Sequence, residues 1–373
     1  FGYGWKYNNT EQVWGSNATV NSKYGYNGKP QAQFVRLDNQ NWRNANTITY
    51  DNPKLGGGKH HLNVMIGQEW SSSQDKLRTS TSVNFPQSFT VDQVLANTAV
   101  GTALSNESTI SAKDNMLSFF GRINYTYADR YLATFTLRAD GSSKFGEGHR
   151  WGVFPSIALA WRASEEKFLK NVDWLSNLKA RLSFGTAGNN RINSDLITQV
   201  YALGSASEKA PFFDGTRASQ LKRSSTLYNP DLKWETTLTR NFGIDFGFLK
   251  NRISGSIDLY WNTTNDLLMS SAIPTNTGYS LQYQNFGKTS NKGVELQFTA
   301  VIFDNKNFGL NFTGNISYNY NKIEEINMDN PWQSSGWSGS TISKYEDYRI
   351  EAGGRLGELW GYKLTGYRQA FTE

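Results

Sequence analysis

The stretch MLSFFGRINYTYADRYLATFTLRADGSSKFGEGHRWGVFPSIALAWR, residues Met116–Arg162, decides the fold of this chain. It holds three runs in which every second residue is apolar or aromatic and most residues between them are polar. A short break at 128–130 separates the first two runs, and a loop rich in Gly and Ser at 141–150 separates the last two. Alternation with a period of two predicts long β-strands with one apolar and one polar face.

The length of these strands indicates a membrane-spanning sheet. The run Trp151–Trp161 covers roughly 33 Å at ~3.3 Å per residue. Tilted by ~40°, such a strand rises roughly 25 Å, the height of the apolar band of a transmembrane β-barrel. An aromatic residue stands at each end, where membrane interfaces favour Trp and Tyr. The alternative is a soluble sandwich with one wet face, although strands in soluble sheets are usually only ~5–6 residues long.

Composition agrees with a barrel. Hydrophobic residues make up 38% of the 373 residues, which suits strands that give half of their side chains to a wet lumen. No apolar run reaches the ~18 residues of a membrane helix. Cys is absent, which excludes disulfides and thiol chemistry. The net charge of +6 comes from scattered Lys and Arg, so we expect no nucleic-acid partner. Because no signal peptide precedes Phe1, we expect a processed protein or a fragment.

The same alternation recurs along the chain and predicts about 11–12 antiparallel strands. The strongest helical signal is Ser164–Asn177, which Ser164 could cap, and a second short helix is expected within Val91–Val100. Strands are expected, besides a strand end within 1–33, at 34–52, 60–74, 117–127, 131–140, 151–162, from 178 on, at 234–248, 253–261, 294–302, 308–320 and from 356 on.

The connections between these strands alternate in length. Short or compact ones are expected near 54–58, 128–130, 163–177, 249–251 and 304–307. Long ones are expected near 71–113, 141–150, 188–231, 267–284 and 325–355. Outer-membrane barrels have short periplasmic turns and longer extracellular loops, whereas a sandwich has no reason to sort loop length by end.

The sequence offers no catalytic or metal-binding pattern, so we expect no enzyme activity, metal or cofactor. His60 and His61 are adjacent on a strand and point to opposite faces. Gly146 and Gly148 lie before a strand rather than a helix, which favours turn glycines over a phosphate loop. Charged residues on the polar strand faces are expected to line a lumen and to pair with one another. These lumen-lining candidates are Arg122, Arg138, Asp140, Arg162, Arg181, Asp245, Asp258 and Glu295.

Aromatic residues in the long loops are candidate contacts for a ligand or partner. Rings can stack on apolar ligand faces while neighbouring amides bind polar edges, which suits a sugar or peptide. Alternatively, the same rings pack the loops together or against a partner, and both readings stay open. The candidates are Phe212, Phe213, Trp332, Trp337, Tyr345 and Tyr348.

Several segments carry a family resemblance. The segment LRADGSSKFGEGHRWGVFPSIALAWRASEEKF, Leu137–Phe168, closely resembles the barrel signature of SusC/RagA-type TonB-linked outer-membrane transporters. Segments at 178–192, 229–268, 285–298 and 356–367 resemble further parts of that family, in the same order.

The resemblance implies that residues 1–373 form the middle of a 22-stranded transmembrane β-barrel in the bacterial outer membrane. The plug, the TonB segment and the closing strands would then lie outside this chain. It further implies import of oligosaccharides or peptides, a SusD-like lipoprotein partner, and contact with the TonB complex through the plug. Membrane lipid would cover the apolar face. An adhesin or passive pore built on the same barrel is the alternative function.

Three structural expectations follow. The chain alone should form an open, curved sheet, because half a barrel cannot pair its two end strands. Arg240 falls on the lipid side of a strand, together with Trp234, so we expect a bulge between Leu238 and Asn241 or a side chain that snorkels to the headgroups. The long loops should expose apolar groups on one rim as a docking surface for the lipoprotein. Besides loop aromatics named above, these groups include Phe85 and Phe89.

Overall fold

A computed structural model describes residues 2–14, 29–203, 210–211, 217–218, 221–326, 332–335 and 348–359. Its main feature is one 12-stranded antiparallel sheet, in the order β1-β2-β3-β5-β6-β7-β8-β14-β15-β18-β19, with β4 paired to β3. The strands are β1 Gly2–Trp14, β2 Gln31–Leu55, β3 His60–Val83, β4 Thr102–Ile110, β5 Asp114–Tyr127, β6 Tyr131–Ser142, β7 Trp151–Arg162, β8 Leu175–Asn189, β14 Glu235–Phe248, β15 Ile253–Asn265, β18 Lys288–Asp304 and β19 Gly309–Glu325.

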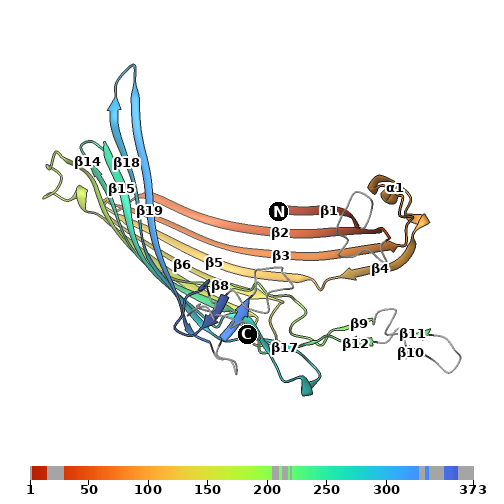
Figure 1. The fold of residues 1–373 in the computed structure, drawn as a ribbon. Coiled ribbons are helices and arrows are strands. Elements are labelled where there is room, and N and C mark those ends of the chain that lie inside the picture. Colours follow the sequence, from red (N-terminus) through yellow and green to blue (C-terminus); the bar gives the residue numbers. More distant parts are fainter. Residues whose placement is uncertain are drawn as a thin grey trace, which may run out of the picture.

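The sheet is curved and open (Figure 1). The edges of its path are β1 and β19, and they are not paired with each other among the described residues. The all-β antiparallel fold, the number of strands and the open sheet are therefore confirmed. Antiparallel order also places the short turns at one end and the long connections at the other, as predicted. Below, these ends are called the turn end and the loop end.

Short helices and strands lie in the connections at the loop end. Helix α1, Val91–Ala96, confirms the start of the predicted short helix. A capping box between Thr90 and Gln93 caps its N-terminus. No helix in the described part of the chain is long and apolar enough to cross a membrane. The remaining elements are η1 Thr98–Val100, β9 Tyr201–Leu203, β10 Ala210–Pro211, β11 Arg217–Ala218, β12 Leu221–Arg223, β13 Thr226–Leu227, β16 Leu268–Ala272, η4 Thr275–Thr277, β17 Leu281–Asn285, β20 Trp332–Ser335 and β21 Tyr348–Glu351.

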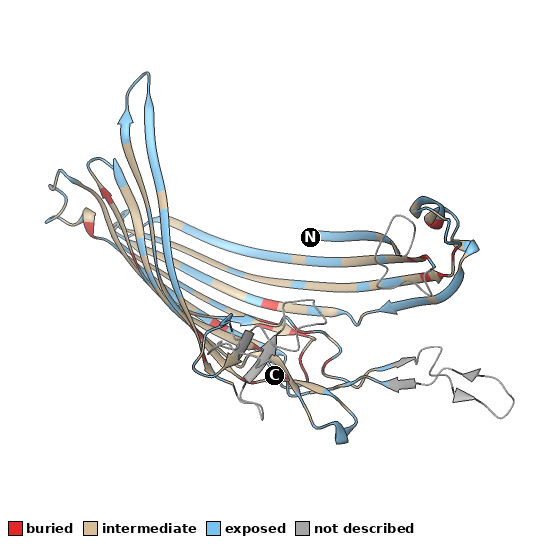
Figure 2. Cartoon of the chain, viewed as in Figure 1, coloured by how far each residue is buried: buried red, intermediate tan, exposed pale blue. Residues whose placement is uncertain are grey.

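The two faces of the sheet differ as the alternation predicts. One face, called the apolar face below, leaves large hydrophobic side chains open to the surroundings, including Trp151, Val153, Ile157, Leu159 and Trp161. The other face, called the polar face, carries most of the charged strand residues. Most of the strand surface is exposed or half-buried, and buried positions are few (Figure 2). Hydrogen-bonded ladders rather than a central core therefore hold the strands together.

Two predicted segments differ from the structure. Residues 71–83 continue β3, and β4 occupies 102–110, so much of the predicted loop at 71–113 is sheet. The predicted helix Ser164–Asn177 is wrong, because only the 3₁₀ turn η2, Ala163–Glu165, forms there, followed by turns. Phe168 and Trp174 in this segment stay 70% and 58% exposed, so there is no packed apolar helix face to stabilise a longer helix.

Trp234, Phe85 and Phe89 are less exposed than expected, and the strand at Arg240 is straight. Trp234 is buried and precedes β14, so it does not lie on the lipid side. Phe85 is fully buried in a small cluster with Phe89 packed against it, so these two rings do not form an exposed rim. The bulge at Arg240 is wrong, because the pairing of β14 with both neighbours is unbroken there. Instead the Arg240 side chain reaches towards the loop end, where its Nη1 donates to the Thr263 hydroxyl at 3.3 Å.

Candidate functional site

The polar face carries an ion-pair network across β8, β14 and β15. The Arg181 guanidinium donates through Nε to both carboxylate oxygens of Asp245, at 3.0 and 3.1 Å, and through Nη2 to Asp258, at 3.1 Å. The Lys179 amine adds a contact to Asp245 at 3.6 Å. The guanidinium spans the middle strand by passing over Gly243, which faces both Arg181 and Asp258 in the sheet.

The space above Gly243 is what permits this bridge. A Cβ atom at that position would lie 2.6 Å from the Asp258 carboxylate and 2.7 Å from the Arg181 guanidinium. Any larger residue would thus occupy the site of the guanidinium. The glycine is required here for close approach of a side chain rather than for an unusual backbone angle.

A second network lies nearer the loop end. Arg138 donates through Nε to Asp140 at 2.7 Å and through Nη2 to the Ser118 hydroxyl at 2.9 Å. Asp140 and Ser118 are both buried. The predicted pairing of polar-face charges thus occurs for Asp140, Asp245 and Asp258. By contrast, Arg122, Arg162 and Glu295 are exposed and form no ion pair with any described residue.

Of the six predicted aromatic contacts, two lie in strands that the structure describes. Phe212, Phe213, Trp337 and Tyr345 lie outside the described residues. Trp332 and Tyr348 belong to the hairpin of β20 and β21, whose backbone pairs Trp332 with Glu351 and Ser335 with Tyr348.

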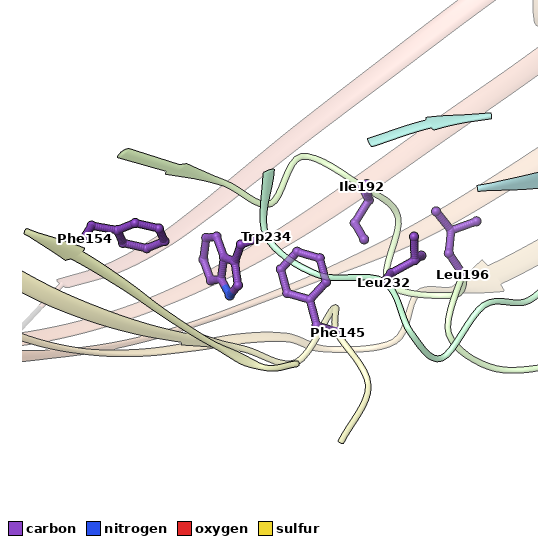
Figure 3. Close-up of a cluster of buried hydrophobic side chains, with 6 residues drawn as sticks. All are labelled: Phe145, Phe154, Ile192, Leu196, Leu232 and Trp234. Atoms are coloured by element: carbon purple, nitrogen blue, oxygen red, sulfur yellow. The ribbon is translucent and has the colours of Figure 1, made fainter. Parts of the chain in front are cut away.

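A cluster of buried hydrophobic side chains lies at the loop end of the polar face (Figure 3). Its centre is Trp234, whose ring centroid lies 5.2 Å from that of Phe145 and 5.5 Å from that of Phe154. The indole N–H donates to the Arg150 carbonyl at 2.9 Å, so this polar atom is satisfied in the buried site. The cluster joins β7 to the loops before it and before β14. Its members are Phe145, Phe154, Ile192, Leu196, Leu232 and Trp234.

Glycines make room for Phe154 on an otherwise polar face. A Cβ atom at Gly188 would come within 2.1 Å of the Phe154 ring, and one at Gly152 within 2.4 Å. The alternation did not predict this cluster, because it assigned the odd positions of β7 to an apolar face and gave no packing partner to Phe154 on the other face. The sequence signal for this cluster is an aromatic residue on the polar face with a glycine nearby on the same strand, Gly152, and another on the neighbouring strand, Gly188.

Next to the cluster lies a polar pocket of about 400 Å³. One wall carries the Lys144 amine, 3.4 Å from the Asp114 carboxylate, and another carries Arg43, which donates to Glu69 at 2.8 Å. The second carboxylate oxygen of Asp114 is buried and accepts no hydrogen bond from the described residues. That oxygen is closed to solvent, so the pocket offers donors and the other, accessible carboxylate oxygen of Asp114. Its lining includes Asn41, Arg43, Glu69, Ser71, Ser73, Asp114, Met116, Ser142, Lys144 and Asn190.

No other chemistry is apparent in the part of the chain that the structure describes. It contains no group of three or more His, Asp or Glu side chains that could hold a metal ion. His60 and His61 have separate partners, since His60 lies 2.6 Å from the Tyr125 hydroxyl and His61 lies 2.8 Å from Asp51.

Comparison with known proteins gives the family. Residues 1–371 match the family model described as TonB dependent receptor-like, beta-barrel. The TonB-dependent receptor SusC of Bacteroides thetaiotaomicron is 38% identical over 251 residues, which cover 67% of this chain and 25% of that protein. A TonB-dependent receptor of Formosa agariphila is 32% identical over 353 residues, which cover 94% of this chain and 31% of the receptor.

Solved structures agree with the sequence relatives. The structure of the RagAB peptide transporter matches with a TM-score of 0.73 and 26% identity, over 94% of this chain and 36% of the matched one. The chain belongs to the TonB-dependent receptor β-barrel family and is an integral outer-membrane protein. It spans about a quarter to a third of the length of the curated relatives it matches. The loop end therefore faces the cell exterior, and the turn end faces the periplasm.

Proposed function

We propose that this chain forms the barrel section of a TonB-coupled importer of oligosaccharides or peptides. The observation that carries the proposal is the family match over nearly the whole chain, and the charged networks on the polar face of the sheet agree with it. In a closed barrel that face lines the lumen, so Arg138, Asp140, Arg181, Asp245 and Asp258 form a hydrated wall along the transport path.

The polar pocket is the part of this wall best suited to hold cargo. Its volume lies within the ~300–1,000 Å³ usual for small-ligand sites. The accessible Asp114 oxygen beside Lys144 can accept a hydrogen bond from a sugar hydroxyl or a peptide N–H, and Lys144 and Asn190 can donate to carbonyl or hydroxyl oxygens. Both cargo classes are rich in such groups, so the pocket suits them equally and does not choose between them.

A SusD-like lipoprotein is proposed as the partner at the loop end. The RagAB structure is that of a peptide transporter and matches nearly all of this chain. The long connections of the sheet all emerge at this end, and deletion of residues 205–226 removes one of them. We expect the lipoprotein to co-purify with the full-length wild-type protein in mild detergent and to be lost on this deletion. A complex unaffected by the deletion would place the docking surface elsewhere.

Uptake measurements test the function itself. The full-length protein is expressed in its own outer membrane, and accumulation of labelled oligosaccharides and peptides is followed with and without functional TonB. We expect uptake that needs both the protein and TonB. Uptake that persists without TonB would mean a passive pore, and surface binding without uptake would mean an adhesin. Either result contradicts the proposal.

A further inference from the structure

The apolar face ends towards the loop end in a row that mixes cations and aromatic rings. Arg240 of β14 pairs with Trp261 of β15, Trp261 pairs with Lys292 of β18, and Lys292 pairs with Tyr320 of β19. These side chains therefore lie side by side on one face of neighbouring strands. The next row towards the turn end contains no charge and consists of Phe242, Leu259, Val294 and Tyr318.

Each cation in this row rests on a ring. The Arg240 guanidinium carbon lies 5.1 Å from the Trp261 ring centroid, and the Lys292 amine lies 5.4 Å from that of Tyr320. Arg355 joins the row from beyond β19, with its guanidinium carbon 4.4 Å from the Tyr320 centroid. The chain at Arg355 is fixed to β19 by the hydrogen bond from the Leu356 N–H to the Asn321 side chain, at 2.8 Å. Rings under cations hold them in place without neutralising them.

Among the described residues no carboxylate pairs with the side chains of this row, and Glu358 accepts only the Arg355 backbone N–H, at 3.4 Å. Across the described residues, Arg240, Lys292 and Arg355 take part in no ion pair. The acid on this face of β19, Glu324, is already bound to Lys322 at 2.7 Å and to the Ser290 hydroxyl at 2.6 Å. The row therefore carries uncompensated positive charge.

Its height places this charge close to the lipid headgroups. Arg240 stands roughly 20 Å above Phe248 at the turn end, by the rise and tilt of a barrel strand. The apolar band is roughly 25 Å tall, so the row lies near the outer boundary. The hydrogen bond from Arg240 to Thr263 turns its guanidinium further outward. Basic side chains near helix or strand ends extend in this way to reach the interface.

We propose that Arg240, Lys292 and Arg355 form a binding site for the phosphate-bearing headgroup of an outer-leaflet glycolipid. Phosphate matches the charge of the row, and a guanidinium can bind it through two parallel hydrogen bonds. The acyl chains of the same lipid lie on the apolar row of Phe242 and Leu259 below. The site is separate from the lumen, so it does not depend on which cargo the protein carries.

The test measures lipid A binding to the full-length protein in mild detergent by native mass spectrometry. The triple variant Arg240→Gln, Lys292→Gln, Arg355→Gln is compared with wild type. Each charge near a lipid surface contributes about a fivefold affinity gain, so we expect a loss of about a hundredfold in the triple variant. The matched control, Lys167→Gln, Lys250→Gln, Lys306→Gln, removes the same charge from exposed positions at the turn end and should bind as wild type does.

A second arm changes the lipid and leaves the protein intact. Wild-type protein should bind lipid A more weakly as its two phosphates are removed in turn. Inorganic phosphate at the same concentration should not displace the lipid, since it lacks chains to occupy the apolar row. The proposal is overturned if lipid A without phosphate binds equally well, if the triple variant binds like the control, or if inorganic phosphate competes fully.

Discussion

Replacing Gly243 by Ala should break the side-chain bridge that Arg181 makes from β8 across β14 to β15. The new methyl group would sit within 2.7 Å of the guanidinium, so the side chain must leave its position over β14. Its contact with Asp245, towards the turn end, can survive this movement. Its hydrogen bond to Asp258 on the far strand cannot, and Asp258 then loses its only charged partner among the described residues.

The cost can be worked from the broken contact. A hydrogen bond between charged groups contributes about 1.5–3 kcal/mol. Both side chains are largely shielded from water, at 32% and 19% exposure, so screening does not erase this value. Ala also restricts the unfolded chain, which favours folding by about 0.4–1 kcal/mol. The control Gly309→Ala carries the same backbone effect, because a Cβ atom there meets nothing within 4 Å.

Equilibrium unfolding of the full-length protein in lipid vesicles by guanidinium measures both variants. We expect Gly243→Ala to be about 1.5–3 kcal/mol less stable than Gly309→Ala, which is the contribution of one charged hydrogen bond. In an Arg181→Ala background the cost of Gly243→Ala should largely vanish, because there is no guanidinium left to displace. Equal stability of the two single variants, or an unchanged cost without Arg181, would refute the bridging role of Gly243.

Three further outcomes are expected. Trp234→Ala should destabilise the loop-end cluster by about 3–5 kcal/mol, whereas Trp151→Ala on the apolar face should cost far less; equal losses in thermal unfolding would contradict this. Hydrogen bonds from Tyr131, Trp161 and Arg130 lower the pKa of Glu166 in the turn between β7 and β8. Its contribution to stability should therefore be full above the ordinary glutamate pKa of ~4.3 and disappear as pH falls through the lowered value, so wild type and Glu166→Gln should converge in melting temperature in acid and differ at neutral pH. Asp114→Ala should weaken uptake of cargo several-fold without loss of folded protein, measured by transport at limiting substrate; unchanged transport would exclude the pocket as a cargo site.

The apolar face was predictable because its signal is local. Each of β5, β6 and β7 shows its own alternation. Each strand is also long enough to cross a membrane, which few strands of soluble sheets are. The same rule failed for the second half of β3. Ser71 and Ser73 are polar on one face and Ser72 is polar on the other, so no alternation marks this part of β3 as strand. Ser164 and the acidic residues after it imitate a helix start, but only η2 and turns form there, and Phe168 and Trp174 stay exposed.

The candidate site depends on register, which the sequence does not state. Arg181 and Asp258 could be assigned to polar faces from alternation alone. Their contact, however, requires Gly243 to stand between them, and this follows only from the pairing of three strands. The position of Trp234 illustrates the same limit. It continues the spacing of β14 by sequence, but the ladder begins at Glu235, and burial against Phe154 then decides where the ring points.

The unequal length of the strands gives the receptor an uneven outline above the cell. β2 has 25 residues, whereas β7 has 12. By the usual rise and tilt, β2 climbs roughly 60 Å and β7 roughly 30 Å, against an apolar band of roughly 25 Å. The loop-end parts of β2 and β3 therefore extend beyond the lipid, with α1 near their far end (Figure 1). Residues 31–41 and 71–83 should therefore stand at the cell surface together with the loops, where antibodies and bacteriophages can contact an ordered sheet as well as loop segments.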